Sequence, residues 1–582
     1  MTDLRALLEM RQAVPLSFSD DGARLLVASN VPGTHQLYEL PARGGELEQL
    51  TDLAEPVSGL YLPDGRVLVE IDAGGNERTQ LYVLGDGGLE ELVVDPRFIH
   101  RTPHVAGDVL AYSTNRRNGV DFDIVARDLR SGEERVFEIG GNCSVESVSH
   151  DGVLVAVERI GEQSGDGDLY VCNTATGEFE HVTPHEGAAE YFSVQWLDHR
   201  LVFATNEGRD TFGIAFDGEM VYEAEWDLDC VVDRAGRNLL VVANEDGYSR
   251  LTLHDPGTHG PGREVPLPGR CVVEHPVFSR DGSLLAYSFS SPVEPHDVYL
   301  YDVDEGKLSR LTTSPREVDV ARLVEPTLHR FDSFDGESVP VFLFEPEGDG
   351  PFPVVVTVHG GPESQWLPWF APSFAPLTQY LVARGYAVAA PNVRGSTGYG
   401  KRYEHLDDIE KRLDSVADLA SLHAWLAARP NIDGNRAVVY GRSYGGYMVL
   451  AALALQPELW AAGIEWVGIS SLVTFLENTS PYRRAARERE YGSLDHDRAF
   501  LVEASPMTHI DAIRAPLFIQ HGRNDPRVPV SESEHIHAVL TTKDIRSELL
   551  IFEDEGHTVE KLPNRIETFT RMAAFLDRVL GS

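Results

Sequence analysis

The chain has 582 residues, which is too many for a single hydrophobic core and predicts at least two large domains. Its 92 aspartates and glutamates outnumber 50 lysines and arginines, and the resulting net charge of −42 would repel nucleic-acid phosphates. No apolar run reaches the length of a membrane span, and residues 1–5 lack the basic and apolar segments that begin a signal peptide. Nucleic acid and membranes are therefore not expected as partners.

The first half of the chain is a short helical segment followed by a long repeat. We expect residues 1–12 to be helical and to pack on the other domain. From residue 13 to residue 325 one sequence motif recurs. It is a polar turn followed by a short strand, and in its clearest copies the turn contains Asp-Gly. Seven copies stand 38 to 46 residues apart, at positions 20–22, 64–65, 106–108, 151–152, 196–198, 234–236 and 281–282.

This repeat predicts a seven-bladed β-propeller over residues 13–325. Short strands, Asp-Gly hairpin turns and a period of about 40 residues are typical of propeller blades. A four-stranded unit cannot bury its own faces, so such units stack around a common axis. A β-sandwich with unrelated turns is the alternative, and the sustained period disfavours it.

Residues 326–582 have a different pattern, in which apolar strands alternate with helices. Residues 354–358 form a continuous apolar run, which is typical of a parallel strand covered on both faces. Further strands are expected at 387–390, 437–440, 464–467, 517–520 and 549–552, with helices at 415–428 and 566–580. This alternation predicts an α/β domain with a doubly wound, mostly parallel sheet.

The octapeptide at residues 441–448 is the strongest motif in the chain. Its Gly-x-Ser-x-Gly core places Ser443 between a predicted strand and a predicted helix, which is the context of a nucleophile elbow. A glycine-rich turn with an uninvolved serine is the bland alternative. The elbow context favours Ser443 as a catalytic nucleophile.

Two later residues complete a candidate catalytic triad. Asp525 follows the strand at 517–520, and His557 follows the strand at 549–552. The chain order Ser443, Asp525, His557 is that of the α/β-hydrolases, in which the histidine is the base and the aspartate orients it. Separately, His557 could be a loop histidine and Asp525 a turn residue before proline, but the joint pattern favours the triad.

An oxyanion hole needs two donors near the nucleophile. One is expected to be the backbone amide of Tyr444, directly after Ser443. The other is expected to be the amide of Gly361, because His359-Gly360-Gly361-Pro362 follows the strand at 354–358, at the position of the HGGG-type motif.

With these motifs in place, residues 326–582 resemble the prolyl oligopeptidase superfamily, most closely its acylaminoacyl-peptidases and dipeptidyl-peptidases. The resemblance rests on the two motifs around Gly361 and Ser443, on residues 392–400 (NVRGSTGYG), on 524–529 (NDPRVP) and on 555–557 (EGH). It implies a serine peptidase that needs no cofactor or metal and whose propeller covers the active site. It also implies that Arg527 lines the specificity pocket; a solvated loop charge is the alternative.

The substrate site is less well defined by the sequence. Phe475 precedes the arginine-rich residues 480–489, and Phe475 is a candidate contact at the edge of that site. For the arginines we favour a solvated helix face over a role in binding a substrate carboxylate. The pair Glu133-Glu134 lies in an apparent hairpin, so the amine-binding role of the paired propeller glutamates of dipeptidyl-peptidase IV is not transferred to it.

The sequence thus predicts a serine peptidase that cleaves short peptides, blocked or free at the N-terminus, near that end. A carboxylesterase with the same triad and a propeller binding protein with an inactive hydrolase domain are the alternatives. Four scattered cysteines without metal-ligand spacing predict buried free thiols and a cytoplasmic location. A homo-oligomer is left open.

Overall fold

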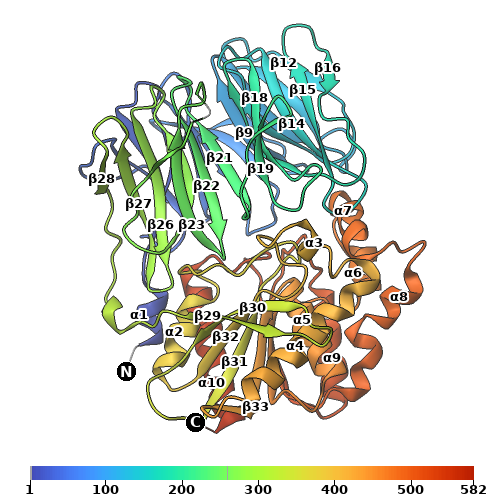
Figure 1. Cartoon of the computed structure of the whole chain (residues 1–582). Helices are drawn as coiled ribbons and strands as arrows, with labels where there is room; N and C mark the ends of the chain where they lie inside the picture. Colours follow the sequence, from blue (N-terminus) through green and yellow to red (C-terminus); the bar gives the residue numbers. More distant parts are fainter. Residues whose placement is uncertain (1–2, 259, 582) are drawn as a thin grey trace.

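The structure, a computed structural model, describes residues 3–258 and 260–581. A β-propeller lies on top of an α/β domain, with helix α7 at the boundary between them (Figure 1). Helix α1 (Leu4–Leu8) packs against α2 (Ala375–Ala383) and α10 (Leu562–Leu580), so the N-terminal segment contacts the α/β domain. Within the described ranges, no helix is both long and apolar enough to cross a bilayer.

In the described part of the chain, seven four-stranded antiparallel sheets follow one another from residue 13 to residue 310, which confirms the predicted seven-bladed propeller. The strands of blades one to four are β1 (Ala13–Phe18), β2 (Arg24–Ser29), β3 (Gln36–Pro41), β4 (Glu48–Gln49), β5 (Val57–Tyr61), β6 (Val67–Ile71), β7 (Gln80–Gly85), β8 (Gly88–Val93), β9 (His100–Ala106), β10 (Val109–Thr114), β11 (Asp123–Asp128), β12 (Glu134–Phe137), β13 (Cys143–Val148), β14 (Leu154–Ile160), β15 (Gly167–Asn173) and β16 (Phe179–His181). Those of blades five to seven are β17 (Tyr191–Leu197), β18 (Arg200–Thr205), β19 (Gly213–Phe216), β20 (Glu219–Tyr222), β21 (Leu228–Val232), β22 (Leu239–Glu245), β23 (Tyr248–His254), β24 (Arg263–Glu264), β25 (Val272–Phe278), β26 (Leu284–Ser291), β27 (Glu294–Asp302) and β28 (Lys307–Arg310).

Each of the seven repeated turns joins the first strand of a blade to the second. In the first copy the Ser19 hydroxyl donates to Asp21 at 2.6 Å, and the same carboxylate accepts the Ala23 amide at 3.0 Å. The copies at 149–153 and 279–283 repeat both bonds. The aspartate therefore closes the turn, and the following glycine has the positive φ that the turn requires, 69° at Gly22.

The α/β domain contains an eight-stranded sheet in the order β29-β30-β32-β31-β33-β34-β35-β36. Its first two strands are antiparallel, and the remaining six run parallel to one another, which confirms the predicted mostly parallel sheet. The strands are β29 (Thr327–Asp332), β30 (Ser338–Phe344), β31 (Phe352–Val358), β32 (Ala387–Pro391), β33 (Ile432–Arg442), β34 (Ala462–Trp466), β35 (Leu517–Gly522) and β36 (Ser547–Phe552).

Helices cover both faces of this sheet, so apolar side chains are buried on both faces of its central strands. Along β31, Val354 and Val356 belong to the hydrophobic cluster on one face and Val355 to the cluster on the other. The remaining helices are α3 (Lys401–Glu404), α4 (Arg412–Ala427), α5 (Tyr444–Leu455), α6 (Leu472–Asn478), α7 (Pro481–Tyr491), α8 (Arg498–Glu503) and α9 (Ser531–Thr542), with 3-10 helices η1 (Val320–Arg322), η2 (Ile409–Lys411) and η3 (Pro506–Ala512).

Every blade of the propeller contacts the α/β domain. The contacts lie in or near the turn between the second and third strands of each blade, on the side opposite to the Asp-Gly turns. In blade order, they are Gly33 with Leu562, Gly74 with Asn524, Phe122 with Tyr482, Gly161 with Arg489, Asp210 with Lys401, Asn244 with Gln365 and Ser290 with Phe370. The propeller thus rests on the α/β domain around its whole circumference.

Candidate active site

Ser443 lies at the sharp turn between β33 and α5, with φ 61° and ψ −119°. A serine rarely adopts this left-handed backbone, and such strain is concentrated at functional sites. The neighbouring glycines allow the turn, because a Cβ on Gly441 would collide with the Gly445 carbonyl and one on Gly445 with the Val358 carbonyl. A Cβ on Gly446 would lie 2.6 Å from the Cα of Gly468. The local geometry is therefore that of a nucleophile elbow.

His557 and Asp525 come together at the same edge of the sheet. The Nδ1 atom of His557 donates to the Oδ2 atom of Asp525 at 2.7 Å. The other carboxylate oxygen accepts the backbone amides of Arg527 at 2.8 Å and Val528 at 3.1 Å. His521, which the sequence reasoning missed, lies 3.4 Å from Asp525. The aspartate is thus fixed by several donors and in turn fixes the ring of His557.

The environment separates the protonation states of these two groups. Burial alone would raise the pKa of Asp525, but the charge on His557 and the hydrogen bonds from His521 and His557 hold that pKa well below its usual range. Burial lowers the pKa of His557 to about 4, against the opposing effect of Asp525. At neutral pH the pair is therefore an ionised carboxylate and a neutral imidazole, the form that accepts a proton.

Both predicted oxyanion-hole donors lie beside Ser443. Tyr444 is the first residue of α5, and the first amides of a helix have no acceptor within it. Gly361 lines the same cavity as Ser443, and a Cβ on its neighbour Gly360 would lie 3.3 Å from the Cβ of Ser443. The loop after β31 therefore packs so closely on the elbow that little room is left for a side chain at Gly360.

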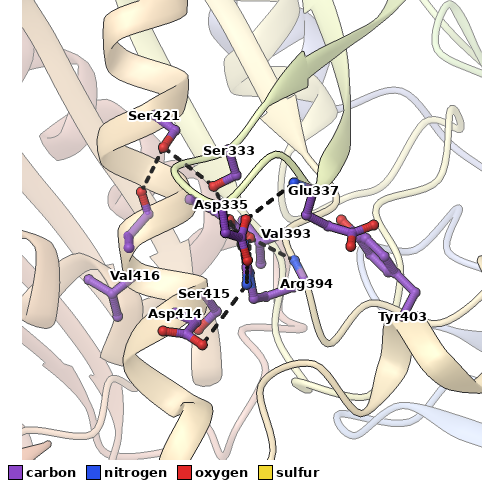
Figure 2. Close-up of polar contacts among 12 residues, drawn as sticks. Ser333, Asp335, Glu337, Val393, Arg394, Tyr403, Asp414, Ser415, Val416 and Ser421 are labelled. Atoms are coloured by element: carbon purple, nitrogen blue, oxygen red, sulfur yellow. Dashed lines mark hydrogen bonds and ion pairs between the residues drawn. The ribbon is translucent and has the colours of Figure 1, made fainter.

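The motif at residues 392–400 supports the loop after β31 through hydrogen bonds. The Nε2 atom of His359 lies 2.9 Å from the Ser396 hydroxyl, and Asn392 accepts the Trp366 amide at 2.7 Å. Arg394 is held between two elements: it donates to Asp335 in the β29–β30 turn at 3.0 Å (Figure 2), and to Asp418 in α4 at 2.9 Å. The motif is thus a scaffold for the site and does not itself line the catalytic cavity.

Ser443 and His557 open into a cavity of about 1080 Å³ between the two domains. Its walls come from the inner strands and loops of the propeller and from the sheet edge of the α/β domain. Such a volume is large enough for a short peptide.

One propeller loop reaches the catalytic loops directly. Residues 72–79, between β6 and β7, place Gly75 so close to Gly556 that a Cβ on Gly75 would lie 2.5 Å from the Gly556 nitrogen. The side-chain amide of Asn524 donates to the Gly74 carbonyl at 3.0 Å. Gly556 precedes His557 and Asn524 precedes Asp525, so this loop contacts both triad-bearing loops.

The two predicted substrate-binding residues have different surroundings. Arg527 lines the cavity, and its Nε atom donates to Glu77 of the same propeller loop. Phe475 does not support the predicted substrate contact: it is 2% exposed in α6 and packs edge-to-face on Tyr491, 5.7 Å between ring centroids. It belongs to the core because the apolar face of α6 turns toward the sheet.

The prediction of a solvated arginine face is wrong for most of α7. Arg489 donates to the Gly161 and Gln163 carbonyls of the propeller, at 2.9 and 2.7 Å. Arg487 lines the cavity, while Arg484 faces solvent and pairs with Glu488. Sequence alone could not show this, because the propeller that covers the helix is distant in the chain.

Comparison with known proteins agrees with this geometry. Residues 372–582 match the model of the prolyl oligopeptidase family, and residues 133–314 match that of the prolyl oligopeptidase N-terminal β-propeller domain. The chain belongs to the prolyl oligopeptidase family. It is thus a serine peptidase, as the sequence predicted.

Relatives within the prolyl oligopeptidase family include peptidases that differ in specificity. Dipeptidyl aminopeptidase BIII of Pseudoxanthomonas mexicana is 26% identical over 99% of this chain and 88% of that protein. Dipeptidyl peptidase family member 6 of Caenorhabditis elegans is 30% identical over 52% of this chain, and the match spans 44% of that protein. A structure from a study of two prolyl endopeptidases superposes with a TM-score of 0.87 at 20% identity, covering 99% of this chain and 91% of that one, which shows a shared fold.

Proposed function

We propose that the chain hydrolyses short peptides near their N-terminus through an acyl-enzyme on Ser443. The observation that carries the proposal is the 2.7 Å bond from His557 to Asp525 beside the strained Ser443, in the cavity between the two domains. In this mechanism His557 takes the serine proton as the hydroxyl attacks the peptide carbonyl, and later gives it to the leaving amine. The amides of Tyr444 and Gly361 stabilise the oxyanion.

The side chains of Ser443 and His557, both within the described residues, are not joined by a hydrogen bond in this structure. Catalytic hydrogen bonds are often long in unliganded enzymes and shorten once substrate fills the site. We therefore assign the proton transfer to the substrate-bound state.

We further propose that the favoured substrates carry a free N-terminal amine. Carboxyl groups of Glu70, Glu274 and Glu363 line the cavity, and burial raises the pKa of each to about 7. A nearby ammonium would stabilise their ionised forms, whereas an N-acyl group would not. The names of the two curated relatives described above also favour a dipeptidyl-peptidase over an acylaminoacyl-peptidase.

A small panel of anilides tests this assignment. Gly-Pro-anilide should be hydrolysed faster than Z-Gly-Pro-anilide if a free amine is preferred, and slower if a blocked end is preferred; acetyl-Ala- and acetyl-Phe-anilides extend the blocked series. A simple acyl ester that is turned over while every anilide resists would instead indicate a carboxylesterase. A protein that a fluorophosphonate fails to label at Ser443 would be a binding protein with an inactive hydrolase domain.

Ser443→Ala should abolish peptidase activity without unfolding the protein. Loss of the nucleophile from such a triad costs on the order of 10⁶ in kcat. His557→Ala should be nearly as damaging, and the double variant little worse, because the two residues act as a unit. Retention of more than a small fraction of activity by Ser443→Ala, measured on the best anilide, would reject Ser443 as the nucleophile.

We also propose a cytoplasmic location. All four cysteines are free and buried, as the sequence predicted, which suits a reducing compartment.

A further inference from the structure

The arginines of α7 divide between two faces of the helix. Arg483 and Arg487 are four residues apart and therefore lie one above the other on one face. Arg484 lies on another face, where it pairs with Glu488 at 3.0 Å and has 44% of its side chain exposed. The face that carries Arg483 and Arg487 is the one turned toward the catalytic cavity.

This part of the cavity already binds one carboxylate, that of Glu77. One oxygen of Glu77 accepts Nε of Arg527, and the other lies 3.5 Å from Nη1 of Arg483. The Nε atom of Arg483 is buried without a hydrogen-bond partner in the structure. The guanidinium groups of Arg527 and Arg483 thus share the single carboxylate of Glu77, and the Nε–H donor of Arg483 is not used.

Arg487 is the arginine of α7 whose guanidinium is available for a ligand. Among the described residues, nothing hydrogen-bonds to its guanidinium or forms an ion pair with it, although it lines the same cavity as Ser443. The carboxyl group of Glu363 faces Arg487 from the loop after β31, beyond ion-pair distance, and its own hydroxyl partner is Ser164 at 2.9 Å. Burial and the nearby Glu490 and Glu190 raise the pKa of Glu363 to about 7, so at neutral pH its charge is only partial.

A guanidinium fork that lines a cavity between two domains is suited to binding a planar anion. Carboxylates match its geometry with two parallel hydrogen bonds, and such charge-assisted bonds are the stronger ones. The net charge of −42 repels anions at long range, so a carboxylate would be retained only by local contacts of this kind.

We propose that Arg487, supported by Arg483, forms a subsite that binds a carboxylate group of the peptide substrate. The proposal rests on the peptidase function proposed above and adds a charge preference to it. The carboxylate comes either from the C-terminus of a short peptide or from an acidic side chain. Both sources present the same anion to the guanidinium, and they can be separated by experiment.

Two matched substrate pairs distinguish the sources. The first pair is a short peptide that begins with the acyl part of the best anilide, prepared with a free C-terminal acid and with a C-terminal amide. The second is the amidated peptide with Glu or Gln at each position in turn. We expect kcat/KM of wild type to favour the carboxylate by about tenfold or more in one of the two pairs, since a hydrogen bond to a charged group is worth that much.

Arg487→Gln should bring this ratio close to one, while Arg487→Lys should keep part of it because the charge remains without the fork. Arg484→Gln, on the solvent face of the same helix, is the matched control and should keep the full ratio. Binding of the same peptides to Ser443→Ala, measured by calorimetry, should show the same preference without catalysis.

Equal rates for acid and neutral peptides in both pairs, or an unchanged ratio in Arg487→Gln, would overturn the subsite. An equal loss of the ratio in Arg484→Gln would do the same, because it would indicate a general effect of helix charge. Neutral peptides would still be hydrolysed in each of these cases. If no peptide of the panel is hydrolysed, the proposed function fails, which is a separate result.

Discussion

At the scale of single residues, the protonation of His557 decides whether Ser443 can react. Burial lowers the pKa of His557 from its ordinary value near 6.5 to about 4, although Asp525 opposes the shift. The neutral ring is the active base, so activity is lost as the pH falls through this pKa and the ring becomes charged.

The acid limb of the pH profile should therefore lie below pH 6.5. The measurement is kcat/KM from pH 3.5 to 9 with an uncharged substrate, so that only the free enzyme titrates. A limb at or above pH 6.5 would show that the charge of Asp525 outweighs burial at this site.

A second residue-scale prediction concerns Arg412, which is fully buried beneath the elbow. It pairs with Asp407 and Glu490, and Asp407 also accepts the Tyr444 hydroxyl at 2.8 Å. Arg412→Ala would leave two buried carboxylates without their cation, which should lower the free energy of unfolding by about 3–5 kcal/mol.

The denaturant midpoint of the α/β domain measures this loss. Arg402→Ala is a suitable control, because Arg402 pairs with Glu337 at the surface and is 59% exposed. Its loss should cost about 1 kcal/mol or less. Similar shifts for both variants would mean that the buried cluster does not stabilise the fold.

At this scale the sequence predicted the positions of the triad well, because each member follows its own strand and the order of the three is informative. It could not predict Glu77 or Gly75. Both lie in a propeller loop about 450 residues before Arg527 in the chain, and nothing local marks them as part of the site. The contact of His521 with Asp525 was not predicted, because His521 lies in a buried strand and a histidine there is expected to be part of the core.

At the scale of elements, the loop at residues 72–79 links the propeller to the catalytic loops. The carboxylate of Asp72 shapes it by accepting the amides of Gly75 at 3.2 Å and Glu77 at 2.9 Å. Its tip then meets the loops that carry Asp525 and His557, through Asn524 and Gly556.

Gly75→Ala should therefore displace the His557 loop and lower kcat by about 10- to 100-fold, because misplacement of about 1 Å costs this much. A small activated ester is the appropriate substrate, since it needs no contact with the propeller. Gly65→Ala is the control: its φ is +86° against +73° at Gly75, yet nothing lies within 4 Å of its added Cβ. Equal losses in the two variants would assign the effect to backbone strain alone.

Most elements were predictable because their patterns are local. The aspartate and the glycine with positive φ recur in the clearest copies of the turn, and the apolar run of β31 indicates burial on both faces. The orientation of α6 and α7 was not predictable. Helical periodicity shows that a helix has two faces, but not which distant domain covers the polar one, and so the α7 arginines were assigned to solvent.

At the scale of the whole molecule, the propeller closes the cavity from above. Contacts from all seven blades surround the site, as described above. The central channel is also obstructed: Arg234 of blade six donates to the Val105 carbonyl of blade three at 2.9 Å, across the ring. We therefore expect the propeller and its contacts with the α/β domain to narrow the routes by which a substrate reaches Ser443.

We predict that this enclosure selects substrates by size more than by sequence. A folded protein cannot bring its backbone to Ser443, and each further residue of a long peptide loses conformational freedom in a narrow route. The backbone term alone is roughly 1–2 kcal/mol per ordered residue, which exceeds most side-chain preferences once several residues are immobilised. The measurement is kcat/KM over one peptide series from two to about forty residues, together with a folded protein. A steep fall with length is expected, and a slower fall in Arg234→Ala would place the route through the channel. Equal rates at every length, or ready digestion of the folded protein, would show that the propeller does not restrict access to the site.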